Sequence, residues 1–214
     1  MQSTFNWPAS DADGVCASQT LGAAGALTLN GALLEASSLL KTRRVIMGDG
    51  IQRSVTITST DDQTGVDFTI VGEDLYGNAV TEVLAGGDNT TVTSVEKYAI
   101  VYSITADAAV GTAITVGSGA GGTTRWWTPN RNANPTSISL YLVIGGTINV
   151  TVQDTPNDIN GGDGLPSTAQ TFNHPTLAGE TSSGSSNYAF PPGAIRLSVA
   201  SGSGTCEFTI IQAD

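Results

Sequence analysis

The sequence contains one histidine and two cysteines, the side chains that most often supply nucleophilic catalysis or metal ligands. His174 lies in the segment FNHPTL, and Cys16 and Cys206 stand far apart in the chain. A serine hydrolase triad would have to use His174, but the sequence has no G-x-S-x-G nucleophile motif. One histidine and two distant cysteines are too few ligands for zinc. We therefore predict no catalytic residue, no metal and no cofactor. We expect His174 to be structural or exposed and Cys206 to be a core residue.

Gly117, Gly119 and Gly122 match the phosphate-binding pattern G-x-G-x-x-G. That pattern binds phosphate only when a helix follows, because the helix N-terminus supplies the backbone donors. The segment TTRWWTP follows instead and does not favour a helix. We interpret the glycine run as a linker.

The loop 154–163 offers oxygen ligands for calcium, namely Asp154, Asn157, Asp158, Asn160 and Asp163. It lacks the central glycine and the final glutamate that an EF-hand loop requires. A solvated loop is the preferred interpretation, and a loose surface calcium site is the alternative.

Four aromatic residues are the candidates for a partner interface. Phe5 and Trp7 lie in a segment without periodicity, where aromatic side chains gain little unless they dock on a partner. Trp126 and Trp127 are adjacent, so on a strand they face opposite sides, one toward the core or a domain junction and one toward a partner. Aromatic residues make up 6% of the chain, which is few for a carbohydrate-binding platform.

The elements that position these residues are short strands separated by polar turns. The stretch around Leu33 and Leu34 fits either a short helix or a strand, and apolar residues then alternate in segments 54–60, 66–71, 79–84, 98–105 and 113–116. Gly145-Gly146 predicts a hairpin between segments 137–144 and 147–153, and SGSG predicts another between 195–200 and 205–211. This pattern predicts an all-β protein of antiparallel sandwiches, jelly-roll or Ig-like, and not a βαβ fold.

We expect three parts along the chain. Residues 1–26 are predicted to form an extended N-terminal arm, because they show no strand or helix period. Residues 27–122 form the first β-sandwich domain and residues 123–214 the second. The boundary is placed where glycine-rich and then Asn/Pro-rich sequence interrupts the strands, with residues 123–136 as a linker.

The charge of the chain excludes several function classes. The net charge is −11, and the sequence offers no cluster of basic residues large enough to grip nucleic acid. Charged residues are 13% of the chain, against roughly 25% in ordinary globular proteins. No apolar run is long enough for a membrane helix, and the N-terminus does not have the form of a signal peptide. We expect the chain to fold in a cytoplasm.

Three motifs in this order resemble a family of structural proteins from tailed bacteriophages. They are D-x-x-G-x-x-F-T-I-x-G from Asp62, G-N-A-x-T-E from Gly77 and P-x-x-A-I-R-L from Pro191. The similarity covers roughly residues 43–116 and 137–214. It implies β-sandwich domains, a place in the head or neck of the virion, and no catalytic residues.

The resemblance and the composition together lead to three hypotheses. The first is a capsid decoration or cement protein that binds the major capsid (coat) protein as a homo-oligomer, with a trimer favoured. An acidic surface avoids the packaged genome, which favours the outer surface of a virion assembled in the host cytoplasm. The second hypothesis places the protein at the neck or tail, and the third is a carbohydrate-binding β-sandwich module.

Overall fold

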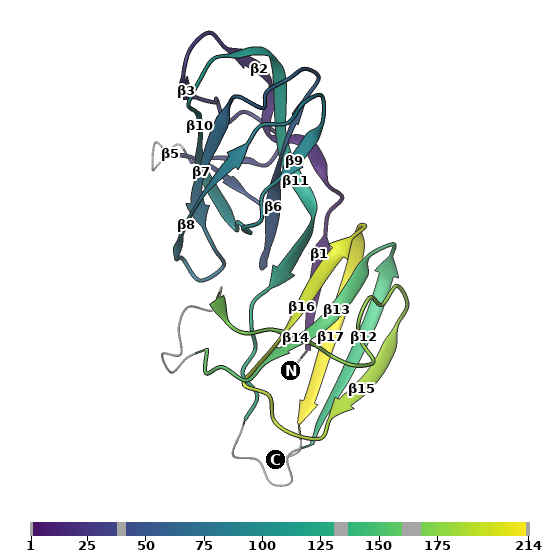
Figure 1. Cartoon of the computed structure of the whole chain (residues 1–214). Coiled ribbons are helices and arrows are strands. Elements are labelled where there is room, and N and C mark those ends of the chain that lie inside the picture. Colours follow the sequence, from purple (N-terminus) through teal and green to yellow (C-terminus); the bar gives the residue numbers. More distant parts are fainter. Residues whose placement is uncertain (1, 38–41, 131–136, 160–167, 213–214) are drawn as a thin grey trace. The chain divides into compact units, whose positions relative to one another are not determined.

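The computed structural model describes residues 2–37, 42–130, 137–159 and 168–212 (Figure 1). Its regular elements are β-strands in several antiparallel sheets, so the prediction of an all-β protein is confirmed. Leu34 begins a strand, so of the two interpretations of the stretch around Leu33 and Leu34, a short helix or a strand, the strand is correct. Within the described ranges, no helix is long and apolar enough to span a lipid bilayer.

The chain forms two compact units. Unit 1 comprises Met1–Ala9 and Thr123–Asp214, and unit 2 comprises Ser10–Gly122. The prediction of an extended arm over residues 1–26 was wrong, because this segment supplies paired strands to both units. Strand β1 (Gln2–Trp7) pairs with β17 (Gly204–Gln212) in unit 1, and β2 (Asp11–Leu21) pairs with β11 (Val110–Thr124) in unit 2.

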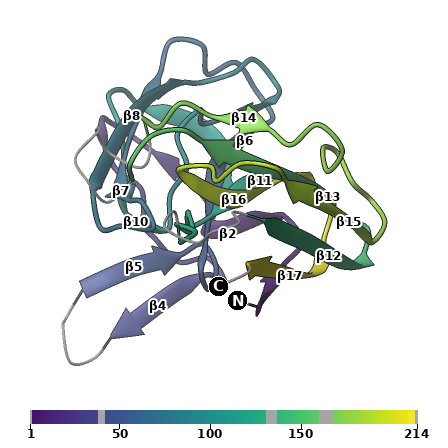
Figure 2. The same ribbon diagram turned by 90° about the horizontal axis from the view of Figure 1, so that it is seen from below.

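Unit 2 is built from strands β2 to β11. Besides β2 and β11 they are β3 (Gly25–Ala26), β4 (Leu34–Ser37), β5 (Thr42–Ile46), β6 (Ile51–Ser59), β7 (Asp67–Glu73), β8 (Ala79–Ala85), β9 (Thr91–Thr93) and β10 (Ile100–Ala106). One sheet has the order β4-β5-β10-β7-β8, with β3 on β10; the other joins β9, β6 and β11, with β2 on β11. Strands β4 and β5 lie side by side as an antiparallel pair (Figure 2).

The core of unit 2 lies between these two sheets. Its buried cluster takes Phe68 and Ile104 from one sheet and Val55, Ile114 and Val116 from the other. The strand period of two explains this for β7 and for β6 from Val55 onward, where buried apolar residues alternate with half-buried or exposed ones. The alternation recognised in segments 54–60 and 66–71 is therefore the core-facing pattern of β6 and β7.

The glycine run of β11 packs against its neighbours and is not a linker. A Cβ atom on Gly117 would lie 2.0 Å from the Asp11 carbonyl oxygen, and one on Gly122 would lie 2.0 Å from that of Gln52. Gly119 would meet the Ser54 hydroxyl at 2.1 Å. Glycine therefore occurs where other segments approach this strand too closely for any side chain.

Unit 1 contains β1, β12 (Ile138–Gly146), β13 (Asn149–Thr155), β14 (Phe172–Asn173), β15 (Gly184–Tyr188), β16 (Ala194–Ser201) and β17. One sheet has the order β1-β17-β12-β15. The other has the order β14-β13-β16, and the last residues of β11, Thr123 and Thr124, also belong to this unit. The Thr124 hydroxyl accepts a hydrogen bond from the backbone N–H of Leu197 on β16 at 3.0 Å.

The two hairpins predicted in unit 1 were wrong. Strand β12 pairs with β17 in one sheet, and β13 pairs with β16 in the other. The register runs from Ile138 opposite Gln212, through Gly146 opposite Gly204, to Thr155 opposite Ala194. Segments 138–155 and 194–212 thus form one long antiparallel ribbon, which we call the bent ribbon, and it folds over so that each half enters a different sheet.

Glycines permit the fold in the bent ribbon. Gly146, Gly202 and Gly204 have φ angles of 101°, 87° and 150°, which L side chains rarely adopt. The pairing continues through the bend, because the Thr147 N–H donates to the Ser203 carbonyl at 2.9 Å. The glycine signal at these two turns was correct, but it marks a corner between sheets and not two hairpin ends.

We expect Gly122→Ala to lower the free energy of unfolding by about 1–3 kcal/mol, because the new methyl group overpacks against the Gln52 backbone. Gly111→Ala in the same strand is the matched control, because nothing lies within 4 Å of its added Cβ, and it should change stability by less than about 0.5 kcal/mol. Urea unfolding followed by circular dichroism measures both, because the tryptophans lie in unit 1 and do not report on unit 2. Equal effects of the two substitutions would contradict the packing role of Gly122.

We expect Trp7→Ala to lower the free energy of unfolding of unit 1 by about 3–5 kcal/mol, because the Trp7 side chain is 1% exposed. Thr4→Ala, an exposed position on the same strand, should cost less than about 0.5 kcal/mol. Thermal unfolding by circular dichroism compares them. A Trp7→Ala protein as stable as the wild type would restore the idea of a separate arm.

Candidate functional site

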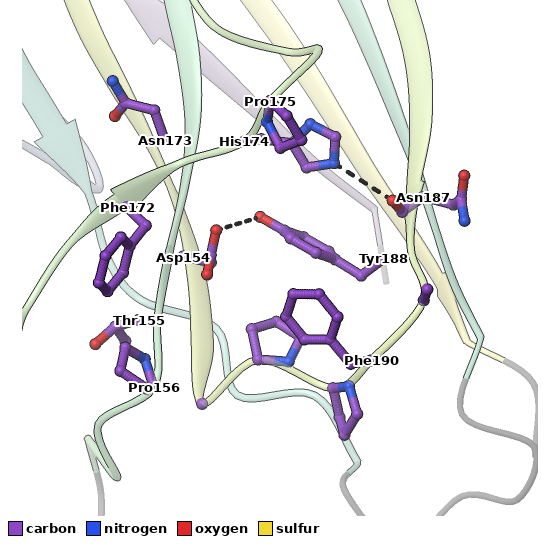
Figure 3. Close-up of a pocket in the computed structure, with 14 residues that line it drawn as sticks. Asp154, Thr155, Pro156, Phe172, Asn173, His174, Pro175, Asn187, Tyr188 and Phe190 are labelled. Atoms are coloured by element: carbon purple, nitrogen blue, oxygen red, sulfur yellow. Dashed lines mark hydrogen bonds between the residues drawn. The ribbon is translucent and has the colours of Figure 1, made fainter.

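A cavity of about 770 Å³ lies at one end of unit 1 (Figure 3). Its walls come from the ends of β13, β14 and β15 and from the segment between β15 and β16. Four prolines contribute to the lining, namely Pro156, Pro175, Pro191 and Pro192. The polar and aromatic lining side chains include Asp154, Phe172, Asn173, His174, Tyr188 and Phe190. We refer to it as the Asp154 cavity.

Strand register places Asp154 in the cavity. Asp154 lies on β13 opposite Ile195 of β16 on one side and opposite Phe172 of β14 on the other. The neighbouring pair joins Gln153 to Asn173, whose side-chain oxygen accepts the Gln153 amide at 3.1 Å. The short strand β14 thus brings an aromatic ring beside a carboxylate from a segment distant in sequence.

Tyr188 is the partner of Asp154. It ends β15, where it pairs with Ile138, and its hydroxyl donates to Asp154 Oδ1 at 3.0 Å. Burial raises the pKa of the Asp154 carboxyl, while the Tyr188 hydrogen bond and the nearby His174 oppose this shift. Burial also raises the pKa of the Tyr188 phenol, and the Asp154 charge adds to that shift. In this pair the Tyr188 phenol is the donor and the Asp154 carboxyl oxygen the acceptor.

His174 is a buried structural residue. Its Nδ1 accepts hydrogen bonds from the backbone N–H groups of Thr176 and Leu177, each at 3.2 Å. Because Nδ1 is an acceptor, the proton lies on Nε2, which faces the Asn187 carbonyl at 3.4 Å. The ring also meets Tyr188 edge-on at 4.8 Å between centroids. This histidine closes a turn and orients Tyr188, in agreement with the structural role that the sequence favoured.

Two phenylalanines form the exposed rim of the cavity. Phe172 is 49% exposed and Phe190 is 60% exposed, whereas Tyr188 between them is buried. In the view of Figure 3 the Phe172 and Phe190 rings lie on either side of the Asp154 carboxylate. Exposed phenylalanine rings around a carboxylate are an unusual surface, because each ring costs hydration free energy unless a ligand covers it.

The four aromatic interface candidates lie elsewhere in unit 1, and none of them is exposed. Trp7 and Trp126 are buried. Phe5 and Trp127 are half-buried and contact each other at 5.4 Å between ring centroids, and Trp127 also contacts Phe208 at 5.5 Å. The Arg196 guanidinium lies 4.3 Å from the Trp126 ring centroid. These contacts give all four residues a packing role within unit 1.

Trp126 and Trp127 make different contacts, Trp126 with Arg196 and Trp127 with Phe5 and Phe208. Trp127 pairs its backbone with Ile195 through two hydrogen bonds of 2.7 and 2.8 Å, which fixes the segment against β16. The predicted linker 123–136 therefore begins with paired residues. Its residues 131–136 lie outside the described part of the chain.

Both cysteines are buried and free, and they belong to different units. Burial raises the pKa of each thiol to about 12, so neither forms a thiolate at neutral pH. The core position expected for Cys206 is confirmed.

The calcium alternative at 154–163 falls partly on residues 160–163, which lie outside the described residues. Among the residues described, no cluster of three or more His, Cys, Asp or Glu side chains could hold a metal ion. The Asn157 side-chain oxygen accepts hydrogen bonds from the Thr155 hydroxyl and the Gln170 N–H, at 3.1 and 2.8 Å. These bonds stabilise the start and end of the loop.

No protein-family model matches the chain, and no curated protein matches it.

Sequence reasoning missed the Asp154 cavity. Asp154 was considered only as a calcium ligand, and the rim residues Phe172 and Phe190 were not considered at all. Two segments, FNHP with His174 and YAFPP with Tyr188, each combine aromatic residues with proline. This repeated combination was the available signal for the cavity. Proline next to an aromatic residue holds that residue in a fixed extended backbone, which suits a preformed binding surface.

We expect Asp154→Ala to lower the free energy of unfolding by about 1–3 kcal/mol, because it leaves the buried Tyr188 hydroxyl without its acceptor. Asp154→Asn keeps an acceptor oxygen and removes a half-buried charge, so it should be nearly neutral or stabilising at neutral pH. Chemical denaturation of the wild type and both variants measures the difference.

The difference in stability between the wild type and Asp154→Asn should also depend on pH, in a direction that the pKa shift fixes. Folding raises the pKa of Asp154 above its ordinary value of 3.8, so the folded chain binds this proton more tightly than the unfolded chain does. Wild-type stability relative to Asp154→Asn should therefore fall as pH rises from 3.8 through the raised pKa. A relative stability that instead rises over this window would contradict the assigned burial of Asp154.

Proposed function

We propose that this protein is a non-enzymatic structural protein of a tailed-phage virion, a decoration or cement protein that binds and stabilises the coat shell. Support comes from the three ordered motifs, which resemble that family, and from an acidic chain with few charged residues. A surface of this kind contacts proteins and avoids the packaged nucleic acid.

The observation that carries the proposal is the outer face of the β1-β17-β12-β15 sheet. Alternation along these strands presents hydroxyl and amide side chains outward, including Thr4, Thr205, Ser185 and Asn187. Three large apolar side chains accompany them: Tyr141 is 45% exposed, Val143 52% and Ile211 54%. Tyr141 and Ile211 are diagonal neighbours across the β12–β17 pair, so they are near enough to act together.

A face of this composition suits protein–protein contact. Interface cores combine aromatic and aliphatic side chains with a rim of uncharged polar groups. Small hydroxyl side chains also lose little conformational entropy when a partner orders them. A standard contact buries roughly 800 Å² on each partner, and symmetric repetition of weak contacts raises avidity. We infer a homo-oligomer on the shell, with a trimer favoured because icosahedral shells offer three-fold positions.

The finer fold assignment belongs to this proposal. The bent ribbon gives each sheet of unit 1 one strand pair, which favours a jelly-roll-like sandwich over an up-and-down arrangement. Unit 2, with its core between two antiparallel sheets, fits a sandwich of the jelly-roll or Ig-like class.

A neck or tail position is the alternative within the same class. It would use the same contact chemistry, and the copy number per particle separates the two. A copy number comparable to that of the coat protein supports decoration, whereas a few copies per particle support the neck or tail.

We expect particles that lack this protein to burst at a lower temperature, because a ligand of the assembled shell stabilises it by mass action. Adding back the wild-type protein should restore the bursting temperature, and a Tyr141→Asp, Val143→Asp double variant should not. Val95→Asp, at a still more exposed position in unit 2, is the control. Light scattering during heating measures bursting, and analytical ultracentrifugation measures the oligomer. Unchanged bursting of depleted particles would contradict the function, and a stable monomer would contradict the trimer.

A further inference from the structure

The Asp154 cavity holds a carboxylate without a lysine or arginine beside it among the described lining residues. Arg196 lies on the adjacent strand, but its Nε donates to Gln153 at 3.0 Å and its guanidinium stacks on Trp126. Among the described lining residues, the Asp154 charge is met by the Tyr188 hydroxyl and the nearby His174 ring.

The described side chains of the cavity offer unused hydrogen-bond acceptors and few hydrogen-bond donors. A carboxylate offers about four acceptor positions, and the Tyr188 hydroxyl occupies one of them on Oδ1. Two donors of the described lining side chains are in use: Tyr188 donates to Asp154, and the Thr155 hydroxyl donates to Asn157 at 3.1 Å. The side-chain amides of Asn173 and Asn187 also carry donors, but in Figure 3 they point away from the Asp154 carboxylate. His174 faces the Asn187 carbonyl through Nε2, and its Nδ1 is an acceptor. A ligand that only donates hydrogen bonds matches this inventory.

The aromatic rim of the cavity also favours a positively charged ligand. Phe172 and Phe190 lie on either side of the carboxylate with much of their ring surface exposed (Figure 3). The Tyr188 and Phe190 rings are 6.0 Å apart in an edge-to-face arrangement. Aromatic rings attract cations through the negative potential of their faces, and the attraction grows where water is excluded.

We propose that the Asp154 cavity binds a basic side chain, lysine or arginine, which a partner protein inserts between Phe172 and Phe190. Ammonium and guanidinium groups carry donors and no acceptor, and their alkyl stems suit the proline walls. The cavity of about 770 Å³ is large enough for an entire side chain of this kind. The identification of the partner as the coat protein rests on the proposed function, whereas the chemistry of the ligand does not.

A sugar fits the same cavity less well. Sugar hydroxyl groups act as both donors and acceptors, so a sugar site needs protein donors as well as rings. The carboxylate would also stay uncompensated beneath a neutral sugar, and the raised pKa of Asp154 shows that its surroundings already disfavour the charge.

The direct test is a titration of the full-length ¹⁵N-labelled protein followed by NMR. The probes are N-acetyl-arginine methylamide and N-acetyl-lysine methylamide, with N-acetyl-citrulline methylamide as the uncharged isostere of arginine and methyl glucoside as the sugar. We expect saturable shifts of the amides of Phe172, His174 and Tyr188 with at least one charged probe, and none with citrulline or the glucoside. Asp154→Asn should weaken binding by about tenfold or more, and Phe190→Ala by about two- to fivefold.

Glu180→Gln is the matched control, because it removes one negative charge from unit 1 outside the cavity lining. It should leave the charged-probe affinity unchanged. Unchanged amide spectra away from the cavity show that each variant is folded. The proposal is overturned if neither charged probe gives saturable shifts, if citrulline or the glucoside binds as well as the charged probes, or if Asp154→Asn and Glu180→Gln bind alike. Preferred binding of the glucoside would support a carbohydrate module instead.

Binding to particles separates this inference from the proposed function. Wild-type protein that binds depleted particles, with Asp154→Asn binding more weakly and Glu180→Gln binding normally, supports both. Equal binding by wild type and Asp154→Asn would overturn the cation contact with the shell and leave decoration standing. Failure of the wild type to bind would overturn decoration, while the probe titration would still decide the chemistry of the cavity.

Discussion

The register of the bent ribbon is the constraint on which unit 1 depends. Segments 138–155 and 194–212 stay paired from end to end, and the fold at Gly146 and Gly202–Gly204 assigns each half to its own sheet. A slip of one residue would turn every core side chain outward. The same register places Asp154 between Ile195 and Phe172, so the cavity is a direct consequence of how the ribbon pairs.

Close backbone approach is the corresponding constraint in unit 2. Gly117 and Gly122 let the Asp11 and Gln52 backbones approach β11 to distances that no side chain allows. A buried polar contact also depends on this close approach of β6 to β11: the Arg53 Nε donates to the Gly119 carbonyl at 2.8 Å. Burial lowers the pKa of Arg53, and the Asp11 charge opposes that shift. Glycine thus acts as a packing residue in a chain whose composition suggested only flexibility.

The sequence predicted what depends on local periodicity and failed where pairing is non-local. Alternation located β6, β7 and β8 and established the all-β class. The turns at Gly145-Gly146 and Gly202–Gly204 were found, but a turn does not reveal whether its flanking strands pair with each other or with strands fifty residues away. Likewise, Phe5 and Trp7 lie on the more buried face of β1, but the alternation covers only these six residues and was too short to be recognised as a strand. The sequence carries a local signal for the Asp154 cavity in FNHP and YAFPP, but it could not show that these segments meet Asp154, because the cavity joins three segments through long-range pairs.

The energetics of Asp154 connect the fold to the proposed contact. A chain with so few charged residues places a carboxylate among proline and phenylalanine side chains, where burial raises its pKa. The Tyr188 hydroxyl offsets part of that cost, but an amide at this position would accept the same hydrogen bond without carrying charge. A neutral side chain at position 154 would therefore make the unbound protein more stable. The charge becomes favourable only when an opposite charge enters the cavity, and the exposed Phe172 and Phe190 rings lose their contact with water in the same step.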